Sequence, residues 1–300
     1  MTKPLISIIM SCYNGEKFIA RSVNSILKQT YQNWELIFWD NNSNDNSRRI
    51  ISQFKDTRIK YFKSDVTTFL SISRENAIKK SRGEFIAFLD VDDAWLKKKL
   101  EYAIKYFDKN EDCSLYFSNY FINYSHKKKI KRIKNKFFQE KDLYNKVFKS
   151  YIENTGLFAL LTVLIKKDIL DKEKYYFDNN LHIAADFELV LRLAEKYKFV
   201  FDEHPSAMYY LHKSNETLNS LEQQTNELLY CYKKIRENKL LLDKLKNYFY
   251  DTINYNFSKI CIQNKDYKNF IGKLFSIKNN ILKLKLVAIF FLYLIGINKI

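Results

Sequence analysis

Short apolar runs alternate with helix-like segments along the first third of the chain. The apolar runs lie at residues 5–10, 34–40, 59–62 and 84–90. The segments between them carry apolar residues at helical spacing, at residues 15–29, 48–54 and 71–82. Strands that helices cover on both faces are apolar throughout instead of alternating with polar residues. The pattern therefore predicts an α/β fold with a mostly parallel sheet flanked by helices.

The later part of the chain follows a different pattern. Residues 158–165 predict one more buried strand, and residues 184–196 predict a helix. From about residue 216 onward the spacing of apolar residues is helical with little interruption. We therefore predict an α/β domain over residues 1–215 and a helical C-terminal region over residues 216–300.

The last apolar segment, Leu286–Ile297, is too short to cross a membrane as a helix. At about 1.5 Å per residue it measures roughly 18 Å, whereas a bilayer core needs about 30 Å. The lysines that flank it are Lys278, Lys283, Lys285 and Lys299. Two interpretations remain open: the segment lies at the surface of an anionic membrane, or it packs on its own domain or on a second copy in a homodimer.

The composition is basic, with 51 Lys and Arg against 34 Asp and Glu and a formal net charge of +17. Such a charge favours anionic partners, although an A+T-rich genome also produces lysine-rich chains, so the charge alone identifies none. No RNA-binding motif accompanies it, and we expect no nucleic acid partner. The cysteines are widely spaced, which predicts reduced thiols and a cytoplasmic protein: Cys12, Cys113, Cys231 and Cys261.

Polar residues follow three of the predicted strands at the point where each strand ends. Asp90, Asp92 and Asp93 come directly after one apolar run. Other strand ends carry Ser11, Tyr13, Asn14 and Asp40. Ligands of open α/β sheets bind at the carboxyl ends of the strands, and clustered carboxylates repel one another unless a cation lies among them. We therefore predict that Asp90 and Asp92 serve a Mg²⁺ or Mn²⁺ ion that carries a diphosphate.

Asp93 has a second interpretation that we favour for this residue. The residues that follow it, Ala94 and Trp95, open a predicted helix. A carboxylate at that position stabilises the positive end of a helix. We therefore expect Asp93 to act as a helix cap.

Two segments, residues 7–47 and 73–101, resemble the inverting glycosyltransferases of family 2, which have the GT-A fold. The shared features are S-x-x-x-x-x-Y-N, a polar loop after the second strand, an Arg before the fourth strand and F-L-D-x-D-D, in this order. The resemblance covers residues 4–110 well and 178–220 more loosely. It implies a GT-A (Rossmann-like) sheet and transfer of a sugar from a nucleotide-diphosphate sugar, with a UDP-sugar as the expected donor.

The resemblance also implies roles for residues on the donor side. Tyr13 and Asp40 would hold the nucleobase and ribose, together with Ser11 and Asn14 from the first strand end. Arg74 would lie near the nucleotide, Asp90 would contact the ribose or a metal-bound water, and Asp92 would bind the metal. The sequence departs from the family at two positions on this side, Asn41 in the loop and Glu75 after the Arg.

On the acceptor side, "HIAADFELVLRLAEKY" resembles the family segment that supplies the catalytic base. The candidate base is Asp186, with helix capping as its alternative role, and Ala185 replaces a family acid. The segment "YYLHKSNET" resembles the loop that closes over the diphosphate. Leu211 replaces its usual Arg, so the metal or phosphate contact would come from His212 or Lys213; for His212 a packing role remains an alternative.

The expected function is an inverting, metal-dependent hexosyltransferase of cell-surface polysaccharide or glycolipid biosynthesis. Its acceptor would be a glycan or a lipid-linked molecule, and its place the cytoplasm or the inner face of the cell membrane. One alternative is a phosphatase of the haloacid-dehalogenase type, although Ala94 stands where such an enzyme has Thr or Val. The other is a non-enzymatic basic protein that binds membrane surfaces.

Overall fold

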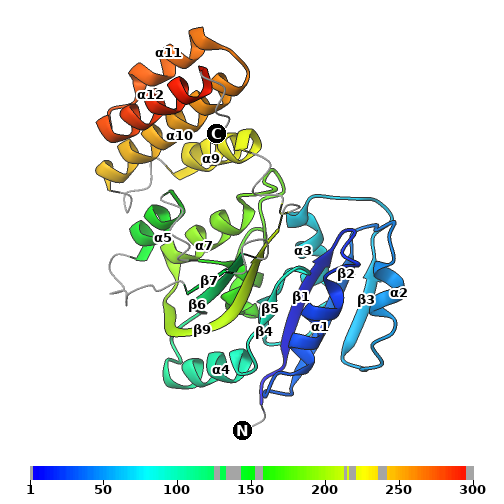
Figure 1. Ribbon diagram of the computed structural model, residues 1–300. Coiled ribbons are helices and arrows are strands. Elements are labelled where there is room, and N and C mark those ends of the chain that lie inside the picture. The colour runs from blue at the N-terminus through cyan, green and yellow to red at the C-terminus, as the bar shows by residue number, and fades with distance from the viewer. Residues whose placement is uncertain are drawn as a thin grey trace. The chain divides into compact units, whose positions relative to one another are not determined.

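The computed structural model describes residues 3–124, 129–132, 143–152, 158–212, 215, 221–235 and 242–294 (Figure 1). These residues form two compact units. The first unit holds the described residues up to 143 and from 158 to 212, and the second holds those from 144 to 152 and from 215 onward. The expected boundary near residue 216 did not anticipate that a segment from the middle of the chain groups with the C-terminal helices.

The first unit is built on one mixed sheet, to which nine strands of the described residues contribute. The strands are β1 (Ile6–Cys12), β2 (Trp34–Asp40), β3 (Ile59–Lys63), β4 (Phe85–Phe88), β5 (Ala94–Trp95), β6 (Leu115–Tyr124), β7 (Lys129–Arg132), β8 (Leu164–Lys166) and β9 (Phe199–Leu211). Their order is β3-β2-β1-β4-β8-β6-β9-β5, and β7 pairs with β6. β1 to β4 pair in parallel, as do β6 and β9, whereas the other pairs are antiparallel. The predicted α/β sheet flanked by helices is confirmed.

The helices of the first unit connect these strands and cover the sheet (Figure 1). They are α1 (Ile19–Leu27), α2 (Ser47–Ile51), α3 (Leu70–Ile78), α4 (Lys99–Lys109), α6 (Lys167–Lys172) and α7 (Ala185–Lys196), with the short 3-10 helix η2 (Leu160–Thr162). α1 and α4 share an apolar core with the residues of β1 that point to one face, such as Ile8 and Met10. α3 packs against β1 and β2. Because both faces of the sheet are covered, the side chains on both sides of these strands are buried. This accounts for their continuous apolar sequences.

Two local predictions were wrong because the decisive contacts are distant in sequence. Ala94 and Trp95 form β5, which pairs with Met208 and Ala207 of β9, so the helix that Asp93 was expected to cap does not begin there. The sequence pattern predicts that Gly83 ends the helix over residues 71–82, but α3 ends at Ile78, five residues earlier. A Cβ on Gly83 would lie 2.6 Å from the backbone nitrogen of Ser7, so the glycine is required by close approach to β1.

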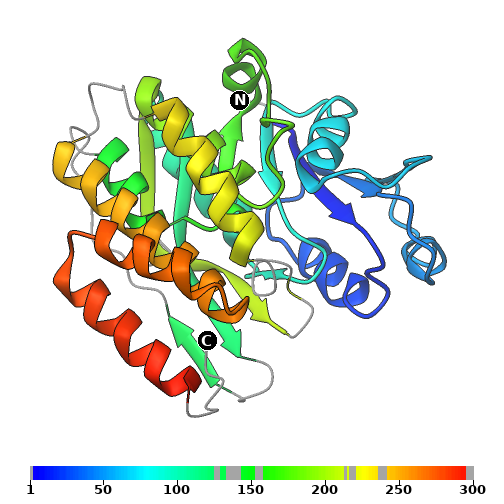
Figure 2. The ribbon, with the colours of Figure 1, turned by 90° about the horizontal axis from the view of Figure 1, so that it is seen from above.

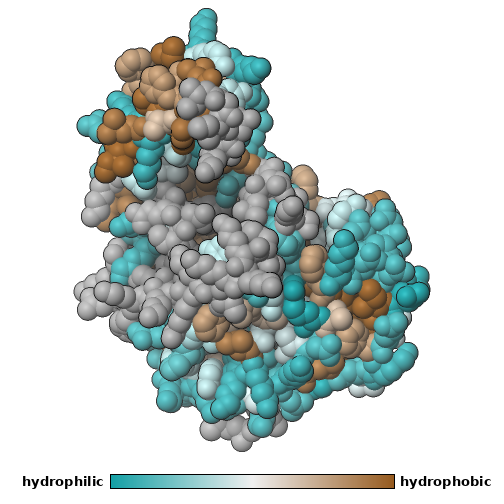
Figure 3. All heavy atoms as spheres, viewed as in Figure 1, coloured by the Kyte–Doolittle hydropathy of each residue, from teal (hydrophilic) through white to brown (hydrophobic). Residues whose placement is uncertain are grey.

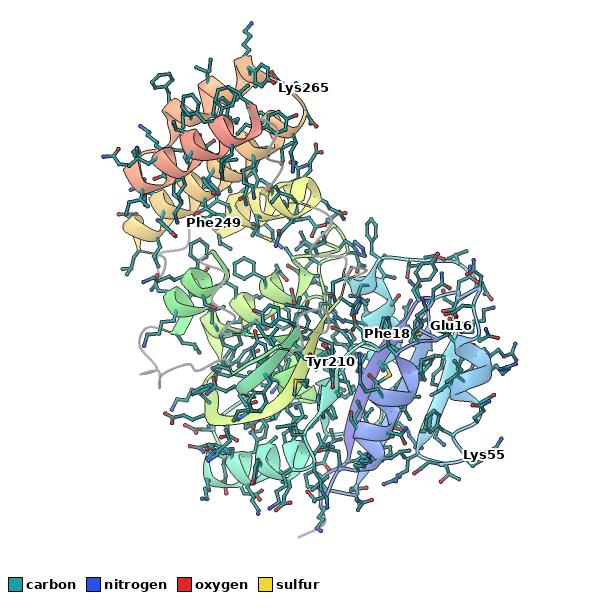
Figure 4. All side chains as sticks on the ribbon, in the orientation of Figure 1. Glu16, Phe18, Lys55, Tyr210, Phe249 and Lys265 are labelled. Carbon is teal, nitrogen blue, oxygen red and sulfur yellow. The ribbon has the colours of Figure 1, made fainter. Side chains whose placement is uncertain are left out.

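The second unit is helical, with α5 (Leu143–Ile152, of which Leu143 counts with the first unit), α9 (Leu221–Ile235), α10 (Asp243–Gln263), α11 (Tyr267–Ser276) and α12 (Asn280–Leu294). α9, α11 and α12 each contact α10, and Figure 2 shows α10, α11 and α12 running side by side. Phe249 of α10, labelled in Figure 4, joins the helices: its ring centroid lies 5.0 Å from that of Phe148 in α5 and 5.1 Å from that of Tyr232 in α9. These ring contacts explain why α5 groups with the C-terminal helices.

Some expectations fall wholly or partly outside the described residues. Residues 125–136 form a basic run, for which the sequence favours a solvated loop or hairpin over a dedicated anion site. Of this run the structure describes the backbone of 129–132, which is the edge strand β7. Lys213 and the last three residues of the apolar segment 286–297 are not described. Across the described residues, no helix combines the length and the apolar character needed to cross a membrane. The four cysteines are free, in agreement with the prediction of reduced thiols.

Candidate active site

The carboxyl ends of β1, β2 and β4 lie side by side at one edge of the sheet. Cys12 at the end of β1 is level with Asp40 at the end of β2. Beyond β4 the backbone N–H of Leu89 still donates to the carbonyl of Ile9, at 3.0 Å. The parallel register therefore brings the polar residues after these strands to one edge, as the sequence pattern predicts.

Asp90 forms an ion pair with Arg74. One Asp90 oxygen lies 2.6 Å from Nη2 of Arg74, whose side chain is 7% exposed, while the Asp90 side chain is 36% exposed. α3 packs against β1 and β2 and so carries Arg74 beneath the strand ends. The next residue, Glu75, pairs instead with Lys79 at 2.6 Å along α3. Glu75, which departs from the family pattern at this position, therefore does not disturb the ion pair between Arg74 and Asp90.

Asp92 contacts His212, which follows β9. Oδ2 of Asp92 lies 2.9 Å from Nε2 of His212, and the imidazole stacks on Phe18 with ring centroids 4.6 Å apart. Desolvation raises the pKa of Asp92, the charge of Asp90 raises it further, and the contact with His212 opposes both. Two residues that are 120 positions apart, each predicted to serve the metal or diphosphate, are thus brought together.

Asp93 is fully buried and ties residues 90–93, which we call the acidic loop, to β9. Its Oδ1 accepts the backbone N–H of Tyr210 at 2.9 Å. Its Oδ2 has no hydrogen-bond partner within the part of the chain that the structure describes. Burial raises the pKa of Asp93 well above its usual range, and the charges of Asp92 and Asp90 add to the effect. Asp93 is therefore a buried support of the loop and not a helix cap.

Two residues of α1, Arg21 and Ser22, hold the acidic loop, and the sequence patterns did not single them out. Ser22 donates through its hydroxyl to the carbonyls of Val91 at 2.8 Å and Asp93 at 2.5 Å. Arg21 donates to the carbonyl of Asp92 and lies over the ring of Tyr210, 3.6 Å from its centroid. Figure 4 labels Phe18, at the start of α1, and Tyr210 on β9. In the sequence, Arg21 appears only as an arginine three residues after an aromatic residue at a helix start. This pattern is too common to predict a role in a site.

Asp186 lies in the first turn of α7, where Arg74 and Asp90 are among its electrostatic neighbours. Its side chain is partly exposed, and its Oδ1 accepts the backbone N–H of Phe187 at 2.8 Å. Desolvation by the surrounding protein raises the pKa of Asp186, and the positive charge of Arg74 opposes that rise. Glu188 and Arg192 are four positions apart, a spacing that predicts an ion pair on a helix, and the structure confirms this pair at 3.2 Å. Glu188 therefore points into an ion pair, whereas Asp186 is the carboxyl that interacts electrostatically with Arg74 and Asp90.

The remaining predicted donor residues surround the end of β1. Tyr13 is 54% exposed, whereas Ser11 is buried and its hydroxyl has no partner among the described residues. Asn14 adopts a positive φ of 51°, and its side chain accepts the N–H of Asn44 at 3.0 Å. Tyr13 is thus the exposed side chain at this strand end, and the Ser11 hydroxyl is a buried group without a partner beside it.

Asp40 is almost fully buried, and both of its oxygens accept hydrogen bonds within the protein. Oδ1 accepts the N–H of Ser43 at 2.8 Å, and Oδ2 accepts the hydroxyl of Tyr61 at 2.7 Å. The next residue, Asn41, bonds to the carbonyl and the N–H of Thr68 at 2.7 and 3.0 Å. In this structure both residues brace the loop after β2, so a ligand contact of Asp40 would use a lone pair left over from these bonds.

The side chains at this edge supply part of the ligand set that a divalent cation needs. Hard oxygen ligands suit Mg²⁺ and Mn²⁺, and an imidazole is compatible with Mn²⁺. Asp92 and His212 supply one carboxylate and one imidazole within 2.9 Å of each other, with Asp90 nearby. In the described part of the chain, no three His, Cys, Asp or Glu residues form a complete metal site. These residues therefore fit an ion that takes its other ligands from phosphate and water.

A separate hollow of about 350 Å³ is lined by residues of α4 and β9, including Tyr106, Asp202 and His204. It contains none of the predicted site residues. We therefore take the edge with the acidic loop as the candidate active site.

Comparison with protein families gives a match to the model described as "Glycosyl transferase family 2", over residues 7–170. The chain is 38% identical over 192 residues to an Escherichia coli UDP-Glc:alpha-D-GlcNAc-diphosphoundecaprenol beta-1,3-glucosyltransferase, covering 59% of this chain and 72% of that protein. It is 34% identical over 247 residues to an uncharacterized glycosyltransferase of Methanocaldococcus jannaschii, covering 80% and 82%.

Solved structures with a similar fold are also glycosyltransferases. S. aureus TarS in complex with UDP-GlcNAc aligns with a TM-score of 0.67 at 16% identity, over 90% of this chain and 79% of that one. The mannosyltransferase PcManGT from Pyrobaculum calidifontis, in complex with GDP-Man and Mn²⁺, aligns with a TM-score of 0.63 at 15% identity, over 95% and 79%. The comparisons support neither the phosphatase nor the non-enzymatic alternative.

Proposed function

The chain belongs to glycosyl transferase family 2, and from this membership we propose that it transfers a sugar from a nucleoside-diphosphate donor to an acceptor hydroxyl with inversion. The observation that carries the proposal is the arrangement of charged residues at one sheet edge. Arg74 pairs with Asp90, His212 pairs with Asp92, and Asp186 lies within electrostatic range of the first pair.

On the acceptor side, Asp186 acts as the general base. It takes the proton of the acceptor hydroxyl as that oxygen forms a bond to the anomeric carbon. On the opposite face the bond from the anomeric carbon to the phosphate oxygen breaks, and its electron pair leaves with the nucleoside diphosphate. The raised pKa of Asp186 makes its carboxylate a stronger base than an exposed aspartate, which suits proton abstraction.

On the donor side, Asp92 and His212, with Asp90 beside them, would hold Mg²⁺ or Mn²⁺. The chemistry that such an ion supplies when bound is stabilisation of the negative charge on the leaving diphosphate. Arg74, held by Asp90, adds a fixed positive charge below the same edge. Tyr13 and Ser11 are the groups at the end of β1 that would contact the nucleotide, with Asn14 and Asp40 shaping the loop beside it.

We propose a UDP-sugar as the donor and a lipid-linked or glycan acceptor at the cytoplasmic face of the membrane. The support is the E. coli relative, whose name specifies a UDP-Glc donor and a diphosphoundecaprenol-linked acceptor. A Bacillus subtilis relative, 35% identical over 39% of this chain, is named as a putative glycosyltransferase of teichuronic acid biosynthesis. We assign the transfer reaction to residues 1–215 and a supporting role to the helical region 216–300.

Substitution of the proposed base tests the mechanism. Asp186→Asn keeps the shape of the side chain but cannot accept the proton, so turnover should fall by roughly 10²–10⁴-fold. The apparent KM for the donor should change little, because Asp186 acts on the acceptor. The measurement is steady-state kinetics with UDP-sugars and Mn²⁺, with the anomeric configuration of the product determined by NMR.

The matched control is Glu195→Gln, which removes an exposed carboxylate from the same helix. This variant should keep its activity. Turnover near the wild-type level in Asp186→Asn would exclude Asp186 as the base, and a product with retained configuration would exclude single displacement.

A further inference from the structure

Exposed large apolar side chains are concentrated on α11 and α12. The exposed members and their exposed fractions are Tyr267 38%, Ile271 51%, Phe275 77%, Ile281 65%, Leu284 70%, Phe291 61%, Leu292 40% and Leu294 55%. Within the described residues of the larger first unit, the corresponding set is Tyr13, Val66 and Phe69. Figure 3 shows the brown, hydrophobic spheres gathered over these two helices. We call these eight residues the apolar face.

The apolar face exists in addition to the packing inside the second unit. Phe290 of α12 stacks on Phe270 of α11 with ring centroids 4.8 Å apart, and Phe270 and Leu286 are buried. Tyr267, Ile271 and Phe275 follow one another at four-residue spacing on the outer side of α11. α12 is apolar at every position from Leu286 to Leu294, so burying one side of this helix leaves apolar residues on the other. An exposed apolar surface of this kind marks a place where a partner binds and shields it from water.

The same segment is strongly basic. From residue 265 to residue 294 the sequence holds six lysines and one acidic residue, Asp266. Four of these lysines are exposed: Lys265, Lys268, Lys278 and Lys285. An exposed apolar surface edged by lysines is typical of helices that lie in the interface of an anionic membrane.

We propose that the apolar face docks the protein on an anionic lipid bilayer, with α11 and α12 lying in the interface. A second copy of the chain is the less suitable occupant, because two such faces would bring like charges together. Over its described residues, Asn280–Leu294, α12 measures roughly 22 Å, against about 30 Å for a bilayer core, so docking at the interface fits it better than spanning. Membrane docking does not depend on which sugar the site transfers.

Sedimentation of the full chain with lipid vesicles tests the proposal. We expect the protein to sediment with vesicles of phosphatidylcholine and phosphatidylglycerol, and to remain largely in solution with phosphatidylcholine alone. Leu284→Gln/Phe291→Gln should lower the partition coefficient by at least about tenfold. The matched control is Leu242→Gln/Tyr250→Gln, which changes one exposed leucine and one exposed aromatic residue outside the face; it should bind as the wild type does.

The charge contribution has its own matched pair of variants. Lys268→Gln/Lys278→Gln/Lys285→Gln should weaken binding to anionic vesicles by on the order of 100-fold, at roughly fivefold per lysine. Lys28→Gln/Lys55→Gln/Lys109→Gln removes the same charge from exposed positions of the first unit and should have little effect. Binding should also weaken as salt is added.

Three results would overturn the proposal. One is a wild-type protein that stays in solution with anionic vesicles. Another is a control variant that loses as much binding as its test variant. The third is a dimer, detected by analytical ultracentrifugation, that Leu284→Gln/Phe291→Gln converts to a monomer, because a second copy would then cover the face. Circular dichroism of each variant checks that the helices remain folded.

Discussion

At the scale of single residues, Arg21 connects three parts of the candidate active site. Its guanidinium donates to the carbonyl of Asp92 and lies over the ring of Tyr210 on β9. It also lies 5.7 Å from the ring of Phe18, which stacks on His212. Arg21 therefore contacts the acidic loop directly and reaches the histidine through Phe18.

Removing this side chain should loosen the proposed metal position. We expect Arg21→Gln to raise the Mn²⁺ concentration needed for half-maximal activity by roughly 10–100-fold, the usual effect of losing a residue that orients metal ligands. The turnover at saturating Mn²⁺ should fall much less. A metal titration of the activity measures this, with Arg49→Gln, an exposed arginine on α2, as the control. Equal metal requirements in the two variants would contradict a positioning role for Arg21.

Lys99 is a second residue whose surroundings make a clear prediction. It is 1% exposed on α4, its Nζ donates to the carbonyl of Thr162 at 3.3 Å, and it lies 4.5 Å from the ring centroid of Trp95. Burial lowers the pKa of Lys99 to about 7. Below that pH the native protein holds a buried charge, and between about pH 7 and pH 10.4 the unfolded chain binds the extra proton. The free energy of unfolding should therefore rise with pH through this window.

Lys99→Met should remove this pH dependence. At about pH 6 the variant should be more stable than the wild type by on the order of 2 kcal/mol, since a shift of one pKa unit corresponds to 1.36 kcal/mol and the lost bond to Thr162 offsets part of the gain. At about pH 10 the two proteins should be nearly equal. Urea unfolding at both pH values is the measurement, and a variant that is less stable than the wild type at pH 6 would contradict the assigned cost of burial.

At this scale the sequence pointed to the acids of the candidate site but not to the residues that hold them. Asp90, Asp92 and Asp186 were found because carboxylates at strand ends and in a family-like segment are unusual. Arg21 and Ser22 were missed because their hydrogen bonds go to backbone carbonyls about 70 residues away. A side chain that binds a distant backbone leaves no pattern of residue types in the sequence.

At the scale of elements, the short antiparallel contact of β5 with β9 sets the position of His212. β5 follows the acidic loop directly, and Ala94 is level with Met208. The bond from the Tyr210 N–H to Asp93 continues this pairing toward the site. The pairing with β5 and the bond to Asp93 together fix the end of β9 beside the acidic loop. His212, which follows β9, therefore lies next to Asp92.

Asp93 should therefore contribute to stability through its bond to Tyr210. Asp93→Ala leaves the Tyr210 N–H without an acceptor and should lower the free energy of unfolding by roughly 1–3 kcal/mol. Asp93→Asn keeps the acceptor and removes the need to bury a carboxyl group, so it should be at least as stable as the wild type. Chemical unfolding of both variants is the measurement. Equal losses in the two variants would show that the carboxylate charge, and not the hydrogen bond, is needed.

The elements that the sequence predicted well are those whose contacts are local or whose burial is complete. β2 runs from Trp34 to Asp40, the bounds expected from its apolar run, because every residue in it is buried. β5 was mistaken for a helix start because a two-residue strand is defined only by its partner, more than 100 positions later. In the predicted strand 158–165, the chain forms η2 first and enters the sheet only at Leu164.

At the scale of the whole molecule, the residues of the proposed transfer reaction and the apolar face lie in different units. The first unit carries every residue assigned to the transfer reaction, from Ser11 to His212. The second unit carries the apolar face with its lysines. The sequence predicted a helical region at the C-terminus from the spacing of its apolar residues. It did not predict that α5 joins this region, because the contact of Phe148 with Phe249 spans about 100 positions.

The central claim is that the acidic sheet edge is completed by a divalent cation and a nucleoside diphosphate. Calorimetric titration of the wild-type protein with UDP, GDP, CDP and dTDP, with and without Mn²⁺, tests it most directly. We predict that at least one nucleotide, UDP first among them, binds more than about tenfold more tightly with Mn²⁺ present. That difference should vanish in Asp92→Asn and persist in Asp168→Asn, which changes an exposed carboxylate on α6. Binding that is the same with and without Mn²⁺, or that keeps its metal dependence in Asp92→Asn, would contradict the account.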